Sequence, residues 1–206
     1  MLSVKNDRVY TYADYLKMDE NVRCEIVDGI LFMMAQLSRL HQKVFRQLFI
    51  LFGNYLSGKP CELYSAPFGV VFMKKEPVFD LVLEDKNPSE YETDAAKSKW
   101  VVEPDITIVC DKSKLTDEGC VGAPDFIVEI LSPSTQLWDL RFKRFLYETN
   151  GVREYWVVDI GKQRVIQWIL FERGAYEVQH LYTFQDPVPC LVLEGCVVDF
   201  LLIDLT

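Results

Sequence analysis

Two acidic residues lie on neighbouring apolar segments of this chain, and a lysine follows the second of them. Asp105 comes directly after Pro104. Glu129 interrupts an apolar segment, and Lys143 lies beyond a Ser-Pro-Ser break. Mg²⁺ prefers hard oxygen ligands, and the negative charge that develops during phosphodiester cleavage is stabilised by a nearby cation. Two carboxylates and a lysine at this spacing therefore make nuclease chemistry the leading hypothesis.

The spacing between Glu129 and Lys143 brings them to the same level if the chain folds back after Pro133. Glu129 lies about four residues before the proline, which is roughly 13 Å of strand at ~3.3 Å per residue. Lys143 lies about nine residues into the following helix, again roughly 13 Å at ~1.5 Å per residue. Asp139 and Tyr147 lie one turn before and after the lysine and share its face. The alternative is an exposed Asp139–Lys143 pair, which contributes ~0.3 to 0.5 kcal/mol.

A second Pro-Asp pair, which ends at Asp125, competes with Asp105 for a metal ion. Asp125 faces the same side of its strand as Glu129, but about four residues of strand separate them by roughly 13 Å. A metal site needs ligands that converge, so Asp105 on a neighbouring strand is better placed. The alternative for Asp105 and Glu129 is a structural acid that is satisfied by backbone donors or an arginine. A charge inside the apolar segment around Glu129 is costly, which favours a functional role.

The hydrophobic pattern predicts helices and strands in mixed order. Thr11 and Asp14 are placed like a helix N-cap and its reciprocating acid, and Asp28-Gly29 between apolar stretches predicts a tight hairpin. The expected helices are residues 10–18, 38–56 and 137–149, the last ended by Asn150-Gly151. The expected strands are the arms of a hairpin at 23–35, residues 63–73, 101–110, 125–131, 154–159 and 163–171, and weaker strands at 176–182 and 191–200.

This order predicts a mixed α/β (α+β) fold in which helices flank a mixed central β-sheet. The chain has 206 residues, half of them hydrophobic, which is enough for one sizeable core, so we expect a single domain at 1–206. Residues 74–99 are acidic and polar with a short apolar interruption. We expect an inserted loop or hairpin there.

Composition narrows the class of protein. No apolar run approaches the ~20 residues that span a bilayer, and residues 1–12 lack the pattern of a secretory signal, so we expect a cytoplasmic protein. The cysteines form no Cys-x-x-Cys pair, and the two histidines have no zinc-ligand spacing, so we expect no structural zinc. Most of the cysteines are expected to be reduced core thiols; they are Cys24, Cys61, Cys110, Cys120, Cys190 and Cys196.

The net charge of −9 argues against a protein that coats nucleic acid, because non-specific DNA affinity comes from Lys and Arg side chains that neutralise phosphates. A local basic strip inside an acidic chain is still compatible with a nuclease. Lys143 with Arg141, Arg144 and Arg153 is the strip that the sequence predicts.

At these same residues the chain resembles the Uma-two family of "putative restriction endonucleases", which belongs to the PD-(D/E)XK nuclease superfamily. The block GAPDFIVEILSPST with the downstream Asp139, Lys143 and Tyr147 is the most specific part of the resemblance. The resemblance covers roughly residues 10–185. The other matching pieces are EIVDG at 25–29, His41 at the start of the long helix, APFGVVF at 66–72, VEPDITIVCD at 102–111 and GVREYWVVD at 151–159.

The resemblance implies a restriction-endonuclease-like core in which Asp105 and Glu129, with the Ile130 carbonyl, hold Mg²⁺ or Mn²⁺. Lys143 would replace the lysine that the superfamily motif places two residues after the acid, where this chain has Leu131. The resemblance also implies that Glu25 is a further catalytic acid. Three residues would have supporting roles: Asp139 would fix the lysine, and Tyr147 and His41 would contact the metal ligands or the phosphate.

Two other classes of function stay open. The same fold could serve as a catalytically silent, dimeric binding protein, which the acidic surface and the missing Glu-x-Lys motif favour. A hydrolase of a small phosphorylated or glycosidic substrate could also use a carboxylate pair. If the chain cuts DNA, a homodimer is expected, because double-strand cleavage needs two sites.

Overall fold

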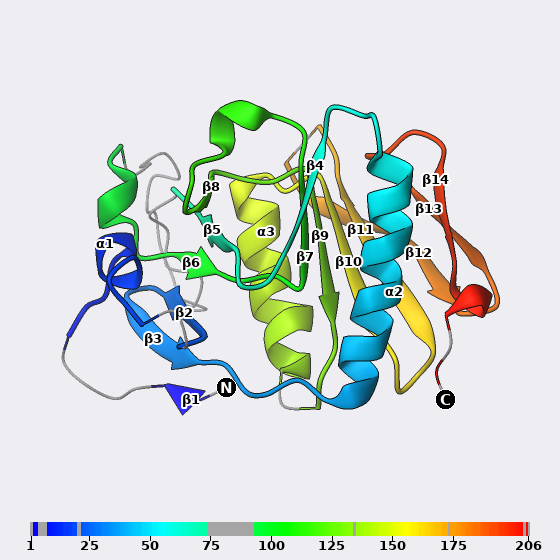
Figure 1. Cartoon of the computed structure of the whole chain (residues 1–206), viewed down its shortest axis with the longest axis horizontal. Coiled ribbons are helices and arrows are strands. Elements are labelled where there is room, and N and C mark those ends of the chain that lie inside the picture. The colour runs from blue at the N-terminus through cyan, green and yellow to red at the C-terminus, as the bar shows by residue number, and fades with distance from the viewer. Residues whose placement is uncertain are drawn as a thin grey trace.

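The computed structural model describes residues 2–3, 8–19, 22–73, 93–133, 135–172, 174–203 and 205. Within these residues the chain forms two six-stranded sheets and one two-stranded hairpin. Figure 1 shows the two larger sheets side by side along the long axis of the molecule. The mixed α/β class with helices against a mixed sheet is confirmed.

The main sheet contains the strand that carries Glu129 and the strand that begins directly after Asp105. Its strands β9 and β10 run parallel, whereas its other neighbouring strands run antiparallel, so the sheet is mixed. The order across the main sheet is β12 (Tyr176–Thr183), β11 (Arg164–Leu170), β10 (Glu154–Asp159), β9 (Phe126–Ile130), β7 (Ile106–Val109) and β4 (Glu62–Ser65).

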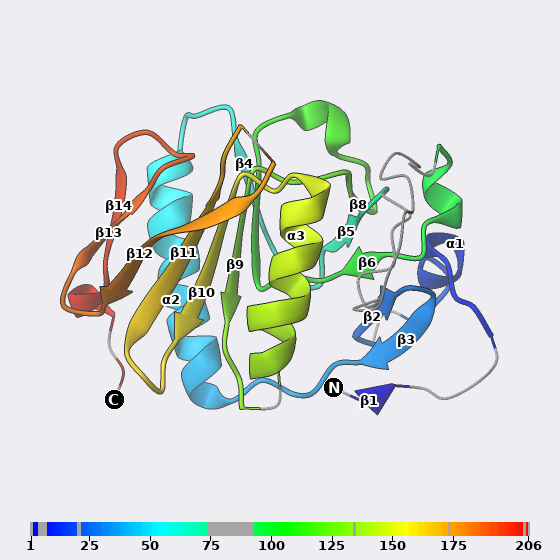
Figure 2. The same ribbon diagram turned by 180° about the vertical axis from the view of Figure 1, so that it is seen from behind.

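Two helices cover opposite faces of the main sheet, as Figures 1 and 2 show from the two sides. On one face lies α2 (Arg39–Leu56), which begins where the Ser38 hydroxyl accepts a hydrogen bond from the His41 backbone N–H. On the other face a π-helical turn, η3 (Trp138–Lys143), continues directly into α3 (Arg144–Asn150). The predicted helices 38–56 and 137–149 are confirmed, although the π turn was not expected.

Strand β9 alternates between these two faces. Phe126, Val128 and Ile130 pack into the buried cluster beneath α2, whereas Ile127 packs into the cluster beneath α3. Because side chains of a strand alternate with a period of two, Glu129 faces the α3 side. The alternation therefore directs this acid toward η3 and α3.

The N-terminal sheet packs beside α3. Its hairpin turns at Asp28 and Gly29, both with positive φ, as the Asp-Gly pair predicted. One buried cluster combines side chains of this sheet with those of η3, α3 and the main sheet. The order of the N-terminal sheet is β1 (Leu2–Ser3), β3 (Ile30–Met33), β2 (Cys24–Val27), β6 (Val101–Val102), β5 (Gly69–Val71) and β8 (Gly119–Val121).

The remaining elements are short. The first helix, α1 (Tyr12–Tyr15), is shorter than the predicted 10–18, and the Asp14 carboxylate accepts the Thr11 backbone N–H as the capping pattern predicted. The predicted strand at 191–200 is present but shorter, at 196–199, where it forms the second arm of a hairpin. The other short elements are the hairpin strands β13 (Pro187–Cys190) and β14 (Cys196–Asp199) and the 3₁₀ turns η1 (Ala95–Lys97), η2 (Lys112–Lys114) and η4 (Phe200–Leu202).

Two predicted strands were wrong because each is split by a proline. Residues 101–110 form β6 and β7 on either side of Pro104, and residues 63–73 form β4 and β5 on either side of Pro67. Proline has no N–H for a ladder and restricts the residue before it. In both cases the chain leaves one sheet and enters the other. Residues 74–92 of the predicted insertion lie outside the described residues.

The prediction that most cysteines are reduced thiols holds for Cys24, Cys120, Cys190 and Cys196, which are buried and free, but is wrong for Cys61 and Cys110, which form a disulfide. The disulfide follows from the antiparallel pairing of β4 with β7. Glu62 lies opposite Val109, so the residues one step further, Cys61 and Cys110, also lie opposite each other. Within the described ranges no helix has the length and hydropathy needed to cross a bilayer.

Candidate active site

Asp105 and Glu129 face each other across the strand pair β7–β9. The antiparallel register places Ile106 opposite Val128, so one further step brings the two acids together. The Asp105 backbone N–H lies 3.4 Å from Glu129 Oε2, and the Ile130 N–H donates to Asp105 Oδ2 at 2.8 Å. Both carboxylates are buried. The structure therefore brings the two predicted metal ligands to one place.

Lys143 reaches the same place from η3. Its Nζ atom lies 2.7 Å from Glu129 Oε1, 2.7 Å from Glu25 Oε1 and 3.9 Å from Asp139 Oδ1. Only 2% of the lysine is exposed. The helix therefore folds back over β9, as the matching lengths of strand and helix predicted. Lys143 is a buried ion-pair partner of Glu129 and Glu25.

Glu25 joins the cluster from the N-terminal sheet. It lies on β2, and its Oε1 atom forms an ion pair with Lys143 and accepts a hydrogen bond from the Glu103 backbone N–H at 3.0 Å. Its other oxygen, Oε2, is buried and finds no hydrogen-bond partner among the described residues. Lys143 thus links an acid of one sheet to an acid of the other.

The three supporting residues also lie in the cluster. Tyr147 donates its hydroxyl to Glu129 Oε1 at 2.8 Å, and His41 Nε2 lies 3.1 Å from Asp105 Oδ2. Asp139 is buried one turn before the lysine. The His41 Nδ1 atom is buried and has no partner within the described part of the chain. Asp105 is therefore contacted by the His41 side chain, and Glu129 by the side chains of Lys143 and Tyr147.

Burial makes two acids of this cluster, Glu129 and Asp139, hold protons tightly. Burial, reinforced by repulsion from Asp139, Asp105 and Glu25, raises the pKa of Glu129 to about 8, although Lys143 opposes the shift. Burial likewise raises the pKa of Asp139 to about 6. For Lys143, burial alone lowers the pKa, but Glu129, Glu25 and Asp139 together raise it well above its ordinary value. The lysine is charged at neutral pH, and the acids around it compete for that one cation.

A pocket opens over the cluster, with about 40 Å³ of space for water-sized groups. One water needs about 10–15 Å³ on this measure, so the pocket has room for roughly three waters or for an ion with part of its hydration shell. The residues that line it are Met34, Ala35, Gln36, Leu37, His41, Asp105, Glu129, Ile130, Ser132, Thr135, Trp138, Asp139 and Lys143.

Comparison with known proteins places this geometry in a family. Residues 12–201 match the family Uma2, which is described as "Putative restriction endonuclease", and this match spans most of the chain. The chain belongs to the Uma2 family. The family that the sequence motifs resemble is therefore confirmed.

Two individual proteins are similar to this Uma2 chain. A crystal structure from Anabaena variabilis, titled a putative nuclease belonging to DUF820, superposes with a TM-score of 0.65 and 14% identity over 93% of this chain and 95% of that chain. At this identity the likeness shows a shared fold. An uncharacterized protein from Synechocystis sp. is 28% identical over 139 residues, which are 66% of this chain and 61% of that protein. The match thus spans about three fifths of that relative's length.

The donor set of this Uma2 site fits a divalent cation. Across the described residues no three His, Cys, Asp or Glu side chains form a ready-made metal group. Mg²⁺ does not require one, because it is commonly bound through one or two carboxylates and keeps several waters. Asp105, Glu129 and the adjoining pocket meet this requirement, and a cation would oppose the effects of burial and of acid–acid repulsion that raise the pKa of Glu129.

The basic strip predicted around Lys143 is wrong. Lys143 is buried, and Arg144 pairs with Glu148. Arg153 pairs with Asp125, the second Pro-Asp acid, whose other oxygen accepts the Cys110 N–H, so Asp125 closes a loop instead of joining the cluster. A different set of cations lies on α2, and the sequence pattern that indicates it is three basic residues at helical spacing in a segment without acids.

Replacing Tyr147 with phenylalanine is expected to lower the free energy of unfolding of this Uma2 protein by about 1.5–3 kcal/mol, the contribution of a hydrogen bond to a charged group. The loss should be larger at pH 9 than at pH 6, because Glu129, with a pKa of about 8, is ionised only at the higher pH. Urea denaturation at the two pH values measures both effects.

Tyr155→Phe is the matched control, because this buried hydroxyl donates to the neutral Asp139 carbonyl at 3.1 Å. It should cost about 0.5–1.5 kcal/mol at either pH. Equal, pH-independent losses for the two variants would show that Tyr147 does not interact with an ionised Glu129.

Proposed function

We propose that this chain is a Mg²⁺- or Mn²⁺-dependent endonuclease that hydrolyses phosphodiester bonds of DNA. The observation that carries the proposal is the convergence of Asp105, Glu129 and Lys143, from two strands and a helix, at one pocket. Membership of a family described as putative restriction endonucleases, and the fold shared with a protein titled a putative nuclease, support it.

In this proposal Asp105, Glu129 and the Ile130 carbonyl hold the metal ion. When bound, the ion supplies a water of lowered pKa and neutralises charge on the phosphate. The Ile130 N–H and His41 fix Asp105 by binding its Oδ2 atom. Tyr147 fixes Glu129 from the opposite side through Oε1. Both carboxylates are thus oriented before substrate arrives, which is what catalysis by preorganised groups requires.

Lys143 supplies the positive charge that the phosphate needs in the transition state. Its ammonium is held between Glu129 and Glu25, with Asp139 nearby, so its position is fixed without reorganisation. Because its pKa is raised, it keeps its proton and acts as a cation that stabilises charge or orients the attacking water. Glu25 and Asp139 act through the lysine.

We also propose that the protein is a homodimer and acts in the cytoplasm. One chain with one such pocket cuts one strand at a time, so cleavage of both strands is expected from a homodimer that presents two pockets. A nuclease of this kind acts on DNA within the cell, which is consistent with the cytoplasmic location expected from the sequence.

Plasmid cleavage tests the proposed function. The protein is incubated with supercoiled plasmid and with single-stranded DNA in Mg²⁺, in Mn²⁺ and in chelator. We expect nicked and linear products with either metal and none with chelator. Binding of DNA without cleavage under all metal conditions would contradict the enzyme and favour the silent binding protein on the same fold. Cleavage that persists in chelator would exclude the metal-dependent mechanism.

A further inference from the structure

The N-terminal half of α2 carries only positive charge. Arg39, Lys43 and Arg46 lie in its first eight residues, and none of its 18 residues is Asp or Glu. The whole chain has 31 acidic and 22 basic residues. A helix without acids is therefore unusual in this protein, and its three cations form a local positive region on an acidic molecule.

Helix stability does not explain these cations. The N-terminus of a helix bears partial positive charge, so a basic residue there is unfavourable and an acid is favourable. Arg39 nonetheless occupies the first helical position. The three cations follow at i, i+4 and i+7, which places them on one face of the helix. Their placement indicates a binding surface rather than a contribution to folding.

This face borders an open groove. The groove has a volume of about 550 Å³ and is lined by Arg39, Gln42, Lys43, Phe45 and Arg46. Arg39, Gln42 and Arg46 are exposed, and Lys43 and Phe45 are partly buried. Neither arginine forms an ion pair with an acid in the part of the chain that the structure describes. Both arginines are exposed to solvent, where a ligand can reach them.

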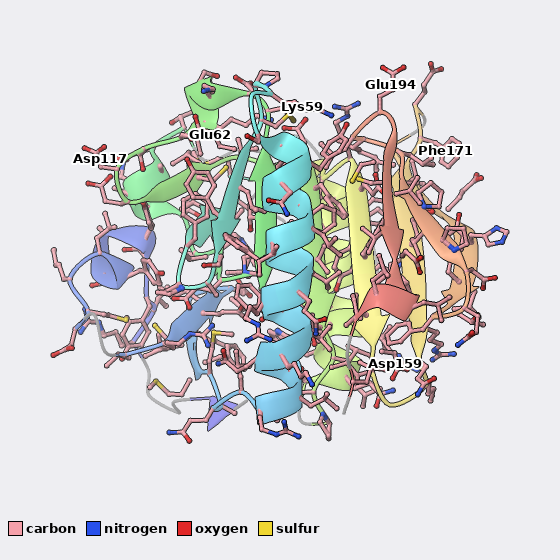
Figure 3. The ribbon with its side chains drawn as sticks, turned by 45° about the vertical axis from the view of Figure 1, so that its right-hand side comes forward. Lys59, Glu62, Asp117, Asp159, Phe171 and Glu194 are labelled. Atoms are coloured by element: carbon pink, nitrogen blue, oxygen red, sulfur yellow. A yellow bond between two sulfur atoms is a disulfide. The ribbon has the colours of Figure 1, made fainter. Side chains whose placement is uncertain are left out.

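The groove and the candidate active site both lie at the N-terminal end of α2, although no described residue lines both. Leu37 and His41 line the active-site pocket, and Arg39 lies between them in the sequence. Figure 3 shows α2 end to end, with Lys59 just beyond its far end. From Arg39 to Arg46 the helix advances roughly 10 Å at ~1.5 Å per residue. One strand of DNA carries one phosphate per ~3.4 Å of helix axis, and its neighbouring phosphates lie farther apart than this because the strand winds around the axis. The two arginines can therefore contact about two phosphates of one strand.

We propose that this groove, which is lined by Arg39, Gln42, Lys43, Phe45 and Arg46, binds the phosphate backbone of duplex DNA beside the scissile phosphate. The inference rests on the proposed function and adds the surface that holds the substrate. A guanidinium group matches two phosphate oxygens at once, so two exposed arginines that pair with no acid among the described residues suit this partner. Contacts of this kind read no bases, so binding through the groove is independent of DNA sequence.

The test measures binding of the whole protein to a labelled DNA duplex in chelator, where metal-dependent cleavage does not interfere. The variant is Arg39→Ala with Arg46→Ala, and the control is Lys59→Ala, a single charge lost just beyond the far end of α2. We expect the double variant to weaken Kd about tenfold and to reduce the slope of log Kd against log salt by about 1.8, which is two phosphate contacts at ~0.9 each.

The control, Lys59→Ala, should change Kd by less than about twofold and leave the salt slope unaltered. The control and the double variant should both unfold at the wild-type temperature or above. If wild type and double variant bind DNA equally well, the groove proposal is overturned and the nuclease proposal survives. If the arginines control binding but metal never produces cleavage, the groove stands and the nuclease proposal fails. If the wild type binds no DNA, both are overturned.

Discussion

Replacing Glu129 with glutamine is expected to slow metal-dependent DNA cleavage by about 10³-fold. Glutamine keeps the size of the side chain and an acceptor for Lys143 and Tyr147, which both contact Oε1. It removes the negative charge that the metal ion needs, and a lost metal contact costs several kcal/mol of transition-state stabilisation, where ~1.4 kcal/mol is tenfold in rate. Single-turnover plasmid cleavage at saturating protein measures the loss.

The fold should tolerate this change at neutral pH. Burial raises the pKa of Glu129 to about 8, so the folded protein without metal already holds this side chain in its protonated, uncharged form. Asp125→Asn is the control, since Asp125 precedes the same strand but pairs with Arg153 outside the cluster. It should leave the cleavage rate within about threefold of wild type if the site is assigned correctly. If Glu129→Gln cleaves DNA at the wild-type rate, the site assignment is wrong.

Replacing Lys143 with methionine is expected to lower the free energy of unfolding by about 3–5 kcal/mol at pH 8, because it leaves buried acids without their cation. Glu129, Glu25 and Asp139 all lose a partner within 4 Å. Methionine retains much of the apolar volume of the lysine stem, so most of the loss is electrostatic. Urea denaturation of the variant and wild type measures it, and a change below about 1 kcal/mol would show that the lysine does not neutralise the cluster.

The pH dependence of this loss has a definite sign. The pKa values of Glu129 and Asp139 are raised to about 8 and about 6, so the folded state binds protons more tightly than the unfolded state. The free energy of unfolding therefore falls as the pH rises from about 4.5 toward 8. Near pH 5 Glu129 and Asp139 are protonated, and Lys143→Met should cost less there than at pH 8. Adding Glu25→Gln to the variant should recover part of the loss at pH 8.

Local signals predicted much of the framework of the site. The Asp28-Gly29 turn, the periodicity of α2 and the apolar segment of β9 each depend on short stretches of chain, and each is present in the structure. The meeting of Glu129 and Lys143 also followed from local geometry. It required only the rise per residue of a strand and a helix and a reversal at Pro133.

The parts that the sequence did not predict depend on contacts between distant segments. Pro104 and Pro67 split continuous apolar segments between two sheets, so the N-terminal sheet was not foreseen. The Glu25–Lys143 contact arises only once that sheet packs beside η3. The Cys61–Cys110 disulfide likewise follows from pairing of β4 with β7. Periodicity within one segment contains no information about such pairings.

The π-helical turn is a further feature that pattern alone did not indicate. π turns are rare and frequently occur at functional sites. Here the turn runs from Trp138 to Lys143 and carries both Asp139 and the lysine. Trp138, Asp139 and Lys143 of this turn line the pocket. The local departure from α-helical geometry thus includes two residues that the proposed chemistry uses, Asp139 and Lys143.

The most direct test of the central claim, that the Asp105–Glu129–Lys143 pocket holds the metal of a DNA-cutting enzyme, is anomalous X-ray scattering from crystals grown with Mn²⁺. The protein is taken from a preparation that cleaves plasmid DNA in Mn²⁺. The account predicts an anomalous peak between the carboxylates of Asp105 and Glu129, and no peak there for Asp105→Asn. An active protein whose Mn²⁺ binds elsewhere, with this pocket empty, would contradict it.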